Sequence, residues 1–448
     1  MTTLTRKYDA IVVGAGLAGL FCALRLQKAG MNVLLIDQRS FPGGLCGTKI
    51  IDGYEFVIAC NDFGQGMEQQ MQELNIPFEF KYKKTQIHYN NVVYCSPPNW
   101  RTILTFISHP WSFGKFVFKL KQNQPEDNDH QEYIEPVVEE LVKDRTLNDL
   151  LKLPAYMMGV TPKDILLEAI NYDSYYQYGY FTPRTPHSGP QELVNTLVQQ
   201  FQKRKGTLKL NTRCIQVEKQ AGQHIVVTDQ GEFCASYIVS SRPRYDLYPA
   251  GTKVGMKLSM FLIAVDKALP FPQDVHTMIY YPPGISWWYE TLDSGNSTDE
   301  FGFHIFKSDL PEKTDHYTMN IYFYLPRGIE EPSLALLQQV ESYIFDKLEK
   351  LVPGLNQALK YKRFISPQQF TQIHGLSSRV TPAILPSGFK KPDNYDAKED
   401  IYYIGNSVYP SGDHAGASIL SGKIVANQII QDWEHGVELA KTSGSNIV

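Results

Sequence analysis

Short apolar runs, glycine-rich turns and helical patterns alternate at both ends of this chain. Residues 10–13 are apolar and mostly β-branched, which predicts a strand buried on both faces. Residues 17–28 have the apolar spacing of a helix that ends near Gly30, and residues 32–36 form a second apolar run. Near the other end, residues 401–404 predict a buried strand, followed by a helix from about residue 417. The pattern therefore predicts a β–α–β unit at the start and a strand–turn–helix unit at the end.

The middle of the chain carries further strand patterns. Residues 191–205 predict an amphipathic helix, which leads to strands within 206–218 and 231–243. Beyond residue 245, four alternating stretches predict one sheet: MKLSMFLIAVD, HTMIYYPP, FGFHIFKSD and YTMNIYFYLP. Trp287, Trp288 and Tyr289 are expected in the core near this sheet, and the lining of a cavity is the alternative.

The turn after the first strand contains Gly14, Gly16 and Gly19 in the spacing G-x-G-x-x-G. The first glycine permits the tight turn, the second lets the backbone approach a pyrophosphate, and the third lets helix and strand pack closely. The helix N-terminus offers free N–H groups and a partial positive charge to that pyrophosphate. Asp37 ends the second strand, where an acid accepts hydrogen bonds from adenosine ribose hydroxyls. Together these features predict a dinucleotide site formed by Gly14, Gly16, Leu17, Ala18, Gly19, Asp37 and Gln38.

The residues that follow indicate which dinucleotide is bound. Gly43 and Gly44 come after a short loop, and a Gly-aromatic turn follows at Gly53. Here the chain resembles the FAD-dependent carotenoid desaturases, flavin amine oxidases and protoporphyrinogen oxidases. In that family a loop ending in Gly-Gly-Arg or a similar sequence borders the flavin. The resemblance implies that Gly43, Gly44 and Leu45 contact the cofactor, although Leu45 stands where arginine is common.

The segment GNSVYPSGDHAGASILSG, residues 405–422, resembles the same family. In the family it carries Gly-Asp, a glycine-bearing turn and a helix whose N-terminus points at the pyrimidine edge of the flavin. Asn406 replaces the usual aspartate and Ala417 replaces a frequent glycine, whereas the Ser421-Gly422 pair matches. The order Gly405-Asn406-Ser407, then Pro410, is most similar to the desaturase, carotene isomerase and retinol saturase branch. The implied contacts are Gly405, Asn406, Gly412, Gly416, Ala417 and Ser418.

The resemblance also implies a domain organisation. We expect an α/β protein with a Rossmann-like FAD-binding domain and an interleaved α+β substrate domain that contains a mixed sheet and helices. The FAD-binding domain is expected to comprise residues 1–95, 186–245 and 386–448, and the substrate domain residues 96–185 and 246–385. By position in the family, the backbone of Cys214 or Ile215 contacts the adenine.

Composition narrows the class of protein. The chain has 448 residues, enough for two domains, and its 43% hydrophobic and 20% charged residues suit a soluble globular protein. A net charge of −4 without a Lys/Arg-rich block gives no basis for nucleic-acid binding. The six cysteines lack C-x-x-C or zinc-site spacing, so reduced thiols and no metal site are expected. Without a signal peptide or a spanning segment, a cytoplasmic protein is predicted.

Residues 99–121 mix apolar and aromatic side chains with Arg101, Lys115, Lys119 and Lys121. Such a stretch can contact a membrane interface peripherally or form the mouth of a channel for a lipophilic substrate. The alternative is an ordinary amphipathic helix pair broken at Pro110. The pattern leaves both interpretations open, and it does not reveal the oligomeric state.

The predicted function is an FAD-dependent oxidoreductase that removes a hydride from a C–C or C–N bond of a small organic substrate, in the manner of a desaturase. A flavin amine oxidase is the alternative, with Lys257 as the candidate for a lysine near flavin N5. A redox-neutral isomerase that uses reduced flavin fits the same motifs. A flavin-free binding protein, similar to Rab dissociation inhibitors, is disfavoured because Gly405, Gly412 and Gly416 are present.

Catalytic side chains are harder to predict, because hydride transfer to a flavin needs a positioned C–H more than an acid or a base. His414 and Tyr409 lie in the flavin-facing turn and are the candidates, although a histidine in a turn is more often structural. No cysteine lies within residues 401–422, where covalent amine oxidases attach flavin, so non-covalent FAD is expected. The electron acceptor is expected to be oxygen, a quinone or another carrier, because no second G-x-G-x-x-G is visible for NAD(P)H.

Overall fold

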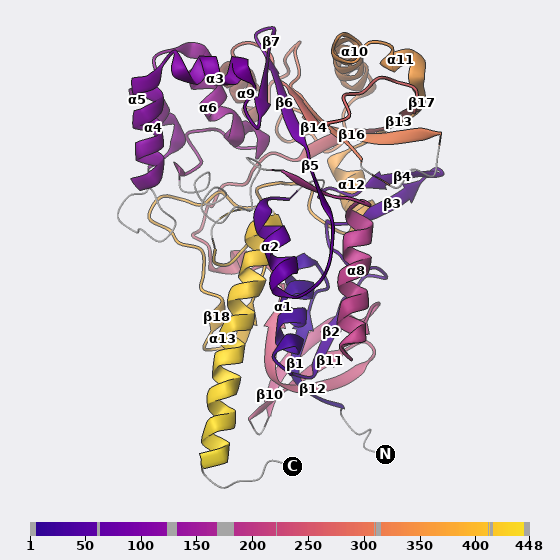
Figure 1. The fold of residues 1–448 in the computed structure, drawn as a ribbon, viewed down its shortest axis with the longest axis vertical. Coiled ribbons are helices and arrows are strands. Elements are labelled where there is room, and N and C mark those ends of the chain that lie inside the picture. Colours follow the sequence, from indigo (N-terminus) through magenta and orange to yellow (C-terminus); the bar gives the residue numbers. More distant parts are fainter. Residues whose placement is uncertain are drawn as a thin grey trace.

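Two β-sheets, one above the other along the long axis, organise the molecule (Figure 1). The computed structural model describes residues 6–60, 63–122, 132–167, 183–220, 222–308, 310, 315–410, 412 and 415–442. Each sheet draws its strands from segments that are far apart in the sequence, so the chain crosses between the two sheets repeatedly.

The first sheet contains the predicted β–α–β unit. Its eight strands include β1, which pairs in parallel with β2 on one side and with β12 on the other. All four residues of β2 are buried, as expected for a parallel strand covered on both faces. The strands are β10 (Cys214–Gln220), β11 (Gln223–Thr228), β12 (Gly231–Ser240), β1 (Arg6–Val13), β2 (Val33–Ile36), β9 (Thr207–Lys209), β19 (Ile401–Tyr403) and β18 (Tyr395–Asp396).

Helix α1 (Leu17–Lys28) lies against one face of this sheet, between α8 (Pro190–Lys203) and α13 (Ala415–Thr442). Nine of the twelve residues of α1 are buried, which explains why its apolar pattern extends almost all the way round. Apolar side chains of α8 and of α13 join the same core cluster. The last helix therefore covers the first one, and the C-terminal segment completes the fold that the N-terminal segment begins.

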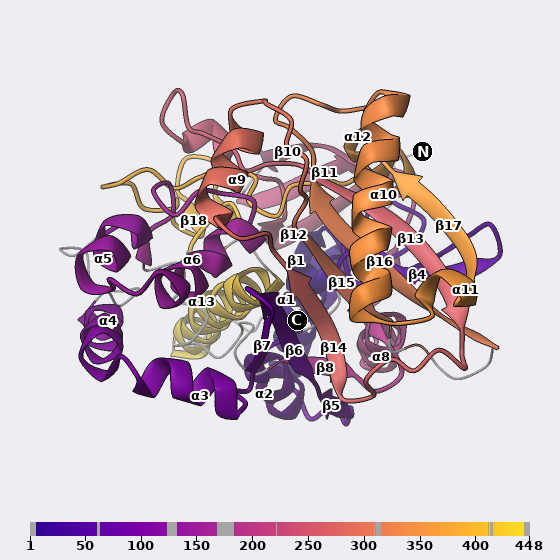
Figure 2. The same ribbon diagram turned by 90° about the horizontal axis from the view of Figure 1, so that it is seen from above.

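The second sheet is mixed, with β14 and β6 as its parallel pair. Helix α10 (Leu334–Leu351) covers one face of it (Figure 2) and contributes Val340, Ile344 and Leu348 to the core. The order of the strands is β17 (Leu359–Ile365), β13 (Leu258–Asp266), β16 (His316–Tyr324), β15 (Phe303–Lys307), β14 (Val275–Tyr280), β6 (Lys84–Tyr89) and β7 (Val92–Ser96). The four predicted strands of this region are thus neighbours in one sheet.

The hairpin of β6 and β7 changes one predicted boundary. We expected residues 1–95 to belong to the first domain, but the parallel pairing of β6 with β14 places residues 84–96 in the second sheet. The shift arises because pairing with β14 depends on a partner almost two hundred residues away, which local alternation does not reveal. We still propose the two-domain division, with the first segment ending before residue 84.

The remaining elements surround the two sheets. Helices α3 to α6 form a lobe beside the second sheet (Figure 1), and α4 begins at Pro110, where the helix pair was expected to break. Two small hairpin-like pairs, β3 with β4 and β5 with β8, join the sheets. The elements outside the two large sheets have these bounds: α2 (Gln65–Glu73), α3 (Trp100–Ile107), α4 (Pro110–Gln122), α5 (Ile134–Leu141), α6 (Arg145–Met157), α9 (Ile285–Asp293), α11 (Leu355–Ala358), α12 (Pro367–His374), β3 (Thr48–Ile51), β4 (Tyr54–Val57), β5 (Phe80–Tyr82) and β8 (Arg184–Pro186).

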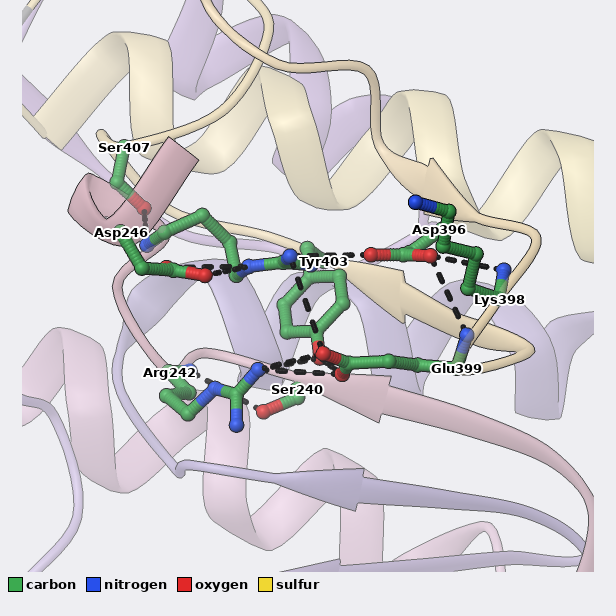
Figure 3. Close-up of polar contacts among 9 residues, drawn as sticks. Ser240, Arg242, Asp246, Asp396, Lys398, Glu399, Tyr403 and Ser407 are labelled. Atoms are coloured by element: carbon green, nitrogen blue, oxygen red, sulfur yellow. Dashed lines mark hydrogen bonds and ion pairs between the residues drawn. The ribbon is translucent and has the colours of Figure 1, made fainter. Parts of the chain in front are cut away.

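A polar cluster fastens the place where the chain leaves the first sheet to the place where it returns (Figure 3). The guanidinium of Arg244, just after β12, lies 3.3 Å from a carboxylate oxygen of Asp246 and 3.0 Å from one of Asp396. It also lies over the ring of Tyr403, and the Arg244 backbone N–H donates to Ser407 Oγ at 2.9 Å. We call these five residues the crossover cluster. Because Arg244 is only 4% exposed, the cluster links the two crossings away from solvent.

We predict that Arg244→Met destabilises the protein by about 3–5 kcal/mol, because it leaves Asp396 partly buried without its cation. Burial acts to raise the pKa of Asp396, but the N–H groups of Glu399 and Lys398 and the Arg244 guanidinium hold that pKa below its ordinary value. A lowered folded-state pKa stabilises the protein at neutral pH, and this contribution disappears as the pH falls through that pKa. The difference in free energy of unfolding between wild type and Arg244→Met, measured by urea titration, should therefore become smaller as the pH is lowered.

The matched control is Arg242→Met, which removes an ion pair with Glu399. In this pair the Arg242 side chain is 56% exposed and the Glu399 side chain is 37% exposed. An exposed pair contributes about 1 kcal/mol or less, so its urea midpoint should stay close to wild type. Equal loss of stability in both variants would show that burial of Arg244 is not the cause.

Candidate active site

The first glycine turn brings the start of α1 against the end of β1. Gly14 has φ +108°, and a Cβ at this position would meet Ser241 Oγ at 1.9 Å. A Cβ on Gly19 would meet the carbonyl oxygen of Gly14 at the same distance of 1.9 Å. Gly16 occupies the N-cap of α1 without a side-chain hydrogen bond to the helix. The first turn of α1 therefore keeps N–H groups available for an anion, as the motif predicts.

Asp37 supports this turn from the end of β2. Its Oδ2 accepts the N–H of Ala15 at 2.8 Å, and its Oδ1 accepts the N–H of Arg39 at 2.9 Å. The side chain is 7% exposed. A carboxylate has about four lone-pair directions, so these bonds leave capacity for the ribose hydroxyls that were predicted as partners. In this structure Asp37 positions the backbone of the turn.

The loop of Gly43 and Gly44 lies directly on the first glycine turn. The Gly43 N–H donates to the carbonyl of Ala15 at 2.7 Å, and a Cβ on Gly44 would lie 3.2 Å from Gly16 Cα. Leu45, where family members often have arginine, is 41% exposed. A guanidinium nevertheless reaches this loop, because Arg39 Nη1 donates to the Gly44 carbonyl at 3.2 Å. Sequence reasoning missed Arg39, which precedes the glycine pair.

The C-terminal glycine turn is held by the helix that follows it. The N–H of Gly405 donates to Ser421 Oγ at 2.8 Å, and Ser421 Oγ donates to the Ser418 carbonyl at 2.6 Å. A Cβ on Gly422 would lie 2.5 Å from the carbonyl oxygen of Ala18, so α13 touches α1 through backbone atoms. The Ser421-Gly422 pair therefore fixes the turn and lets the two helix starts converge.

A cavity of about 380 Å³ lies between these turns and the second sheet. Its floor comes from the glycine turns and the start of α13, and its roof comes from strands β13, β15 and β16 and from the ends of α6 and α12. Roof side chains are mainly apolar: Met157, Met158, Leu258, Met260, Phe306, Phe370 and Leu376, with His304 and Tyr322 among them. A concave site with few polar groups is the usual form of a small-molecule pocket.

Ten of the predicted cofactor residues line this cavity together. They are Gly16, Leu17, Ala18, Gly43, Gly44, Leu45, Gly405, Asn406, Gly416 and Ser418. They come from residues 16–18, 43–45 and 405–418, and the fold brings the last segment to the two N-terminal ones.

Other predicted residues lie outside the cavity lining. Gly14, Gly19 and Ala417 lie behind it at helix contacts, and Gly412 accepts a hydrogen bond from Lys391 Nζ at 2.7 Å. Asp37 and Gln38 follow β2 directly, while Cys214 and Ile215 begin the outer strand β10, where Ile215 is 64% exposed. Their contacts with a cofactor stay predictions.

The structure does not place the candidate catalytic side chains in the cavity lining. His414 lies outside the described residues, and Tyr409 is not among the residues that line the cavity. Lys257, the candidate for the amine oxidase, forms an ion pair with Glu330 and does not line the cavity either. Trp288 and Tyr289 are fully buried in the core beside α9, which confirms the core interpretation for them, whereas Trp287 is 66% exposed.

Sequence reasoning predicted the sheet that forms the roof, but not which of its side chains face the cavity. His304 lies on β15, and the hydroxyl of Tyr281 lies 2.5 Å from its Nε2. Burial lowers the pKa of His304 to about 3, so this imidazole is neutral at physiological pH. Arg379 follows α12 and also lines the cavity. Neither residue belongs to a local motif, and only the pairing of distant strands places them over the glycine turns.

The residues on the floor fit a dinucleotide. A side chain at Gly405 would project into open space, since no heavy atom lies within 4 Å of its Cβ position. Two helices, α1 and α13, begin at the same floor, and their N-termini favour anionic or electron-rich groups. A Rossmann-type sheet with such a floor under an apolar roof defines a dinucleotide-dependent enzyme that acts on a small molecule.

Comparison with known proteins makes the class more specific. Residues 12–70 match the family of the NAD(P)-binding Rossmann-like domain. The phytoene desaturase (lycopene-forming) of Pseudescherichia vulneris is 22% identical over 504 residues, covering 95% of this chain and 99% of that protein. The chloroplastic prolycopene isomerase of Daucus carota is 42% identical over 52 residues, which are 12% of this chain and 8% of its own length. The solved cyclohexylamine oxidase of Brevibacterium oxydans IH-35A is 11% identical, with a TM-score of 0.66 over 95% of this chain and 99% of its own.

The chain is thus similar over almost its whole length to a phytoene desaturase and shares its fold with a flavin amine oxidase, as the predicted resemblance to FAD-dependent oxidoreductases implies. The predicted resemblance, fold class and enzyme class are thereby confirmed. Within the described part of the chain, no helix has both the length and the apolar character needed to cross a membrane.

Proposed function

We propose that the protein binds FAD non-covalently and oxidises a C–C bond of a lipophilic small molecule to C=C, with a hydride leaving one carbon for the flavin and a proton leaving the other for solvent. The observation that supports this proposal most directly is the cavity itself, in which a floor of glycine turns faces a roof of methionine, leucine and phenylalanine. FAD, when bound, supplies the hydride acceptor. The nearly full-length similarity to a phytoene desaturase points to the same class of reaction.

The floor residues hold the cofactor in this proposal. The start of α1 at Gly16 binds the pyrophosphate, and Asp37 accepts hydrogen bonds from the ribose. Gly405 and Asn406 contact the flavin end, where the N-terminus of α13 faces the electron-rich edge of the ring. Ser421 keeps Gly405 in place through its 2.8 Å hydrogen bond, which fixes the turn on the start of α13.

The roof residues position the substrate and exclude water. Met157, Met260 and Phe306 offer apolar surface to a hydrocarbon, and His304 is kept neutral by burial. Hydride removal from a C–H bond depends on the distance and orientation of that bond, so a close apolar fit is the main requirement. No carboxylate lines the cavity among the described residues, which leaves a protonated amine without a partner.

A redox-neutral isomerase is the second candidate, favoured by the local similarity to prolycopene isomerase. It uses the same floor and roof. The two candidates differ in whether the product has more double bonds than the substrate.

The reaction is tested by mixing the flavin-loaded protein anaerobically with phytoene or with decylamine. We expect the yellow flavin absorbance to bleach with the polyene and to persist with the amine, because the cavity solvates hydrocarbon and lacks an anion for the ammonium. Free FAD with each compound serves as the control. Bleaching by decylamine alone would favour the amine oxidase, and an isomerised polyene formed only after the flavin has been reduced beforehand would favour the isomerase.

The cofactor position is tested by Gly405→Leu. The new side chain would occupy the cavity, so we expect purified protein to lose most of its flavin, measured by the ratio of flavin absorbance to protein absorbance. The matched control is Gly231→Leu, because φ is +112° at Gly405 and +117° at Gly231, and neither Cβ position has a heavy atom within 4 Å. Both variants carry similar backbone strain of about 1–3 kcal/mol. Equal flavin content in the two variants would contradict the proposed floor.

We also propose that α3 and α4 contact a membrane surface peripherally. Trp100, Ile103, Leu104 and Ile107 form an i, i+3, i+4, i+7 stripe on α3, and all four are exposed, by 44% to 65%. Such a stripe normally packs on a core. Trp111 on α4 is 82% exposed, and residues 99–122 contain no acidic residue. Apolar side chains combined with basic charge are the usual surface for an anionic lipid interface.

The membrane contact is tested by sedimentation with vesicles that contain phosphatidylglycerol. We expect the double variant Ile107→Ser/Trp111→Ser to bind at least about tenfold more weakly, since it removes two exposed apolar anchors. Trp287→Ser is the matched control, because Trp287 is 66% exposed but lies on α9. A wild-type protein that stays in the supernatant, or an equal loss with Trp287→Ser, would contradict the proposal.

A further inference from the structure

Arg379 is the single formally charged side chain among the described residues that line the cavity, because the buried His304 is neutral. It follows α12 and forms an isolated backbone bridge with Lys257. Its Nε donates to the carbonyl of Gly255 at 3.0 Å, which fixes one edge of the guanidinium. The cation is therefore held in place at the roof by its own backbone and by one hydrogen bond.

The rest of this guanidinium has no protein partner in the described part of the chain. No carboxylate there forms an ion pair with Arg379, and its two Nη groups donate to no described acceptor. Glu330 is near enough to favour the charged form, but its carboxylate pairs with Lys257. Burial of the group lowers the pKa of Arg379, so part of its hydration is lost without replacement.

Two arginines that are more deeply buried than Arg379 have carboxylate partners. Arg184 and Arg244 are each 4% exposed, and each lies within 3.3 Å of a carboxylate oxygen. The exposed Arg327, whose positive charge acts to lower the pKa of Arg379, forms an ion pair with Asp293. Arg379 has no carboxylate partner among the described residues, and it lies at the wall of the cavity.

We propose that Arg379 binds the carboxylate of the substrate, which is an acid with a long apolar body. The guanidinium offers its two Nη groups to the carboxylate, while the apolar body lies against Met157, Met158 and Leu258. The inference rests on the proposed function, because it assigns the substrate class of the same cavity. It adds an acidic head group, which a neutral polyene lacks.

The test is a calorimetric titration of the FAD-loaded protein with four ten-carbon probes: decanoate, decanol, methyl decanoate and decylamine. We expect decanoate to bind about ten- to a hundredfold more tightly than decanol and the ester, since a buried charge-assisted hydrogen bond has that effect. Decylamine should bind most weakly. Equal affinities for all four probes, or the tightest binding for decylamine, would overturn the proposal without any variant.

Two variants locate the effect. Arg379→Met should lose the preference for decanoate and keep the affinity for methyl decanoate, while Arg379→Lys should retain part of the preference. Arg327→Met is the matched control, because Arg327 does not line the cavity and should leave the preference unchanged. If Arg379→Met instead lowers the flavin content and keeps the decanoate preference, Arg379 contacts the cofactor and the proposal is wrong. Flavin content and anaerobic bleaching are measured separately, so failure of the proposed function is recognised independently.

Discussion

Contact between backbone atoms, at positions where no side chain fits, is the constraint on which this structure depends. Gly19 lies against the carbonyl of Gly14, and Gly422 lies against the carbonyl of Ala18. The first contact presses α1 onto β1, and the second presses α13 onto α1. Because both helices start within this contact, their N-termini converge on one floor. A methyl group at either glycine would separate elements whose closeness creates the electropositive end of the cavity.

The floor and the roof are related through the crossover cluster. Arg244 fixes the exit from the first sheet, and its N–H holds Ser407 in the C-terminal glycine turn. Tyr248 adds a hydrogen bond to the Ser407 carbonyl, and the hydroxyl of Tyr245 lies 3.5 Å from Asn406 Oδ1. The strand that carries the chain toward the roof is thus tied to the turn that borders the cofactor floor. These hydrogen bonds therefore join the exit of the chain from the first sheet to the cofactor floor.

The parts of this site that could be predicted are formed by residues close together in the sequence. The parts that could not be predicted are formed by residues far apart in the sequence. The first glycine turn and α1 follow from neighbours in sequence, so their positions were predicted to the residue for the helix and within a few residues for the strands. His304 and Arg379 could not be predicted, because strand pairing and a loop contact far along the chain carry them into the cavity. Residues 84–95 were expected in the first domain, and their pairing in the second sheet depends on an equally distant partner, β14. Tyr409 was expected near the flavin from its place in the turn, but the turn directs other residues to the cavity.

The route of the chain has a consequence for its synthesis. The first sheet takes strands from residues 6–36, 207–240 and 395–403, and α13 from residues 415–442 covers α1. A nascent chain that has reached residue 400 therefore presents the apolar face of α1 to solvent and has only part of the floor. Folding from the N-terminus cannot finish domain by domain as the chain emerges. Chaperone binding during translation, and proteolysis of chains that stop early, follow from an architecture in which the last helix completes the first.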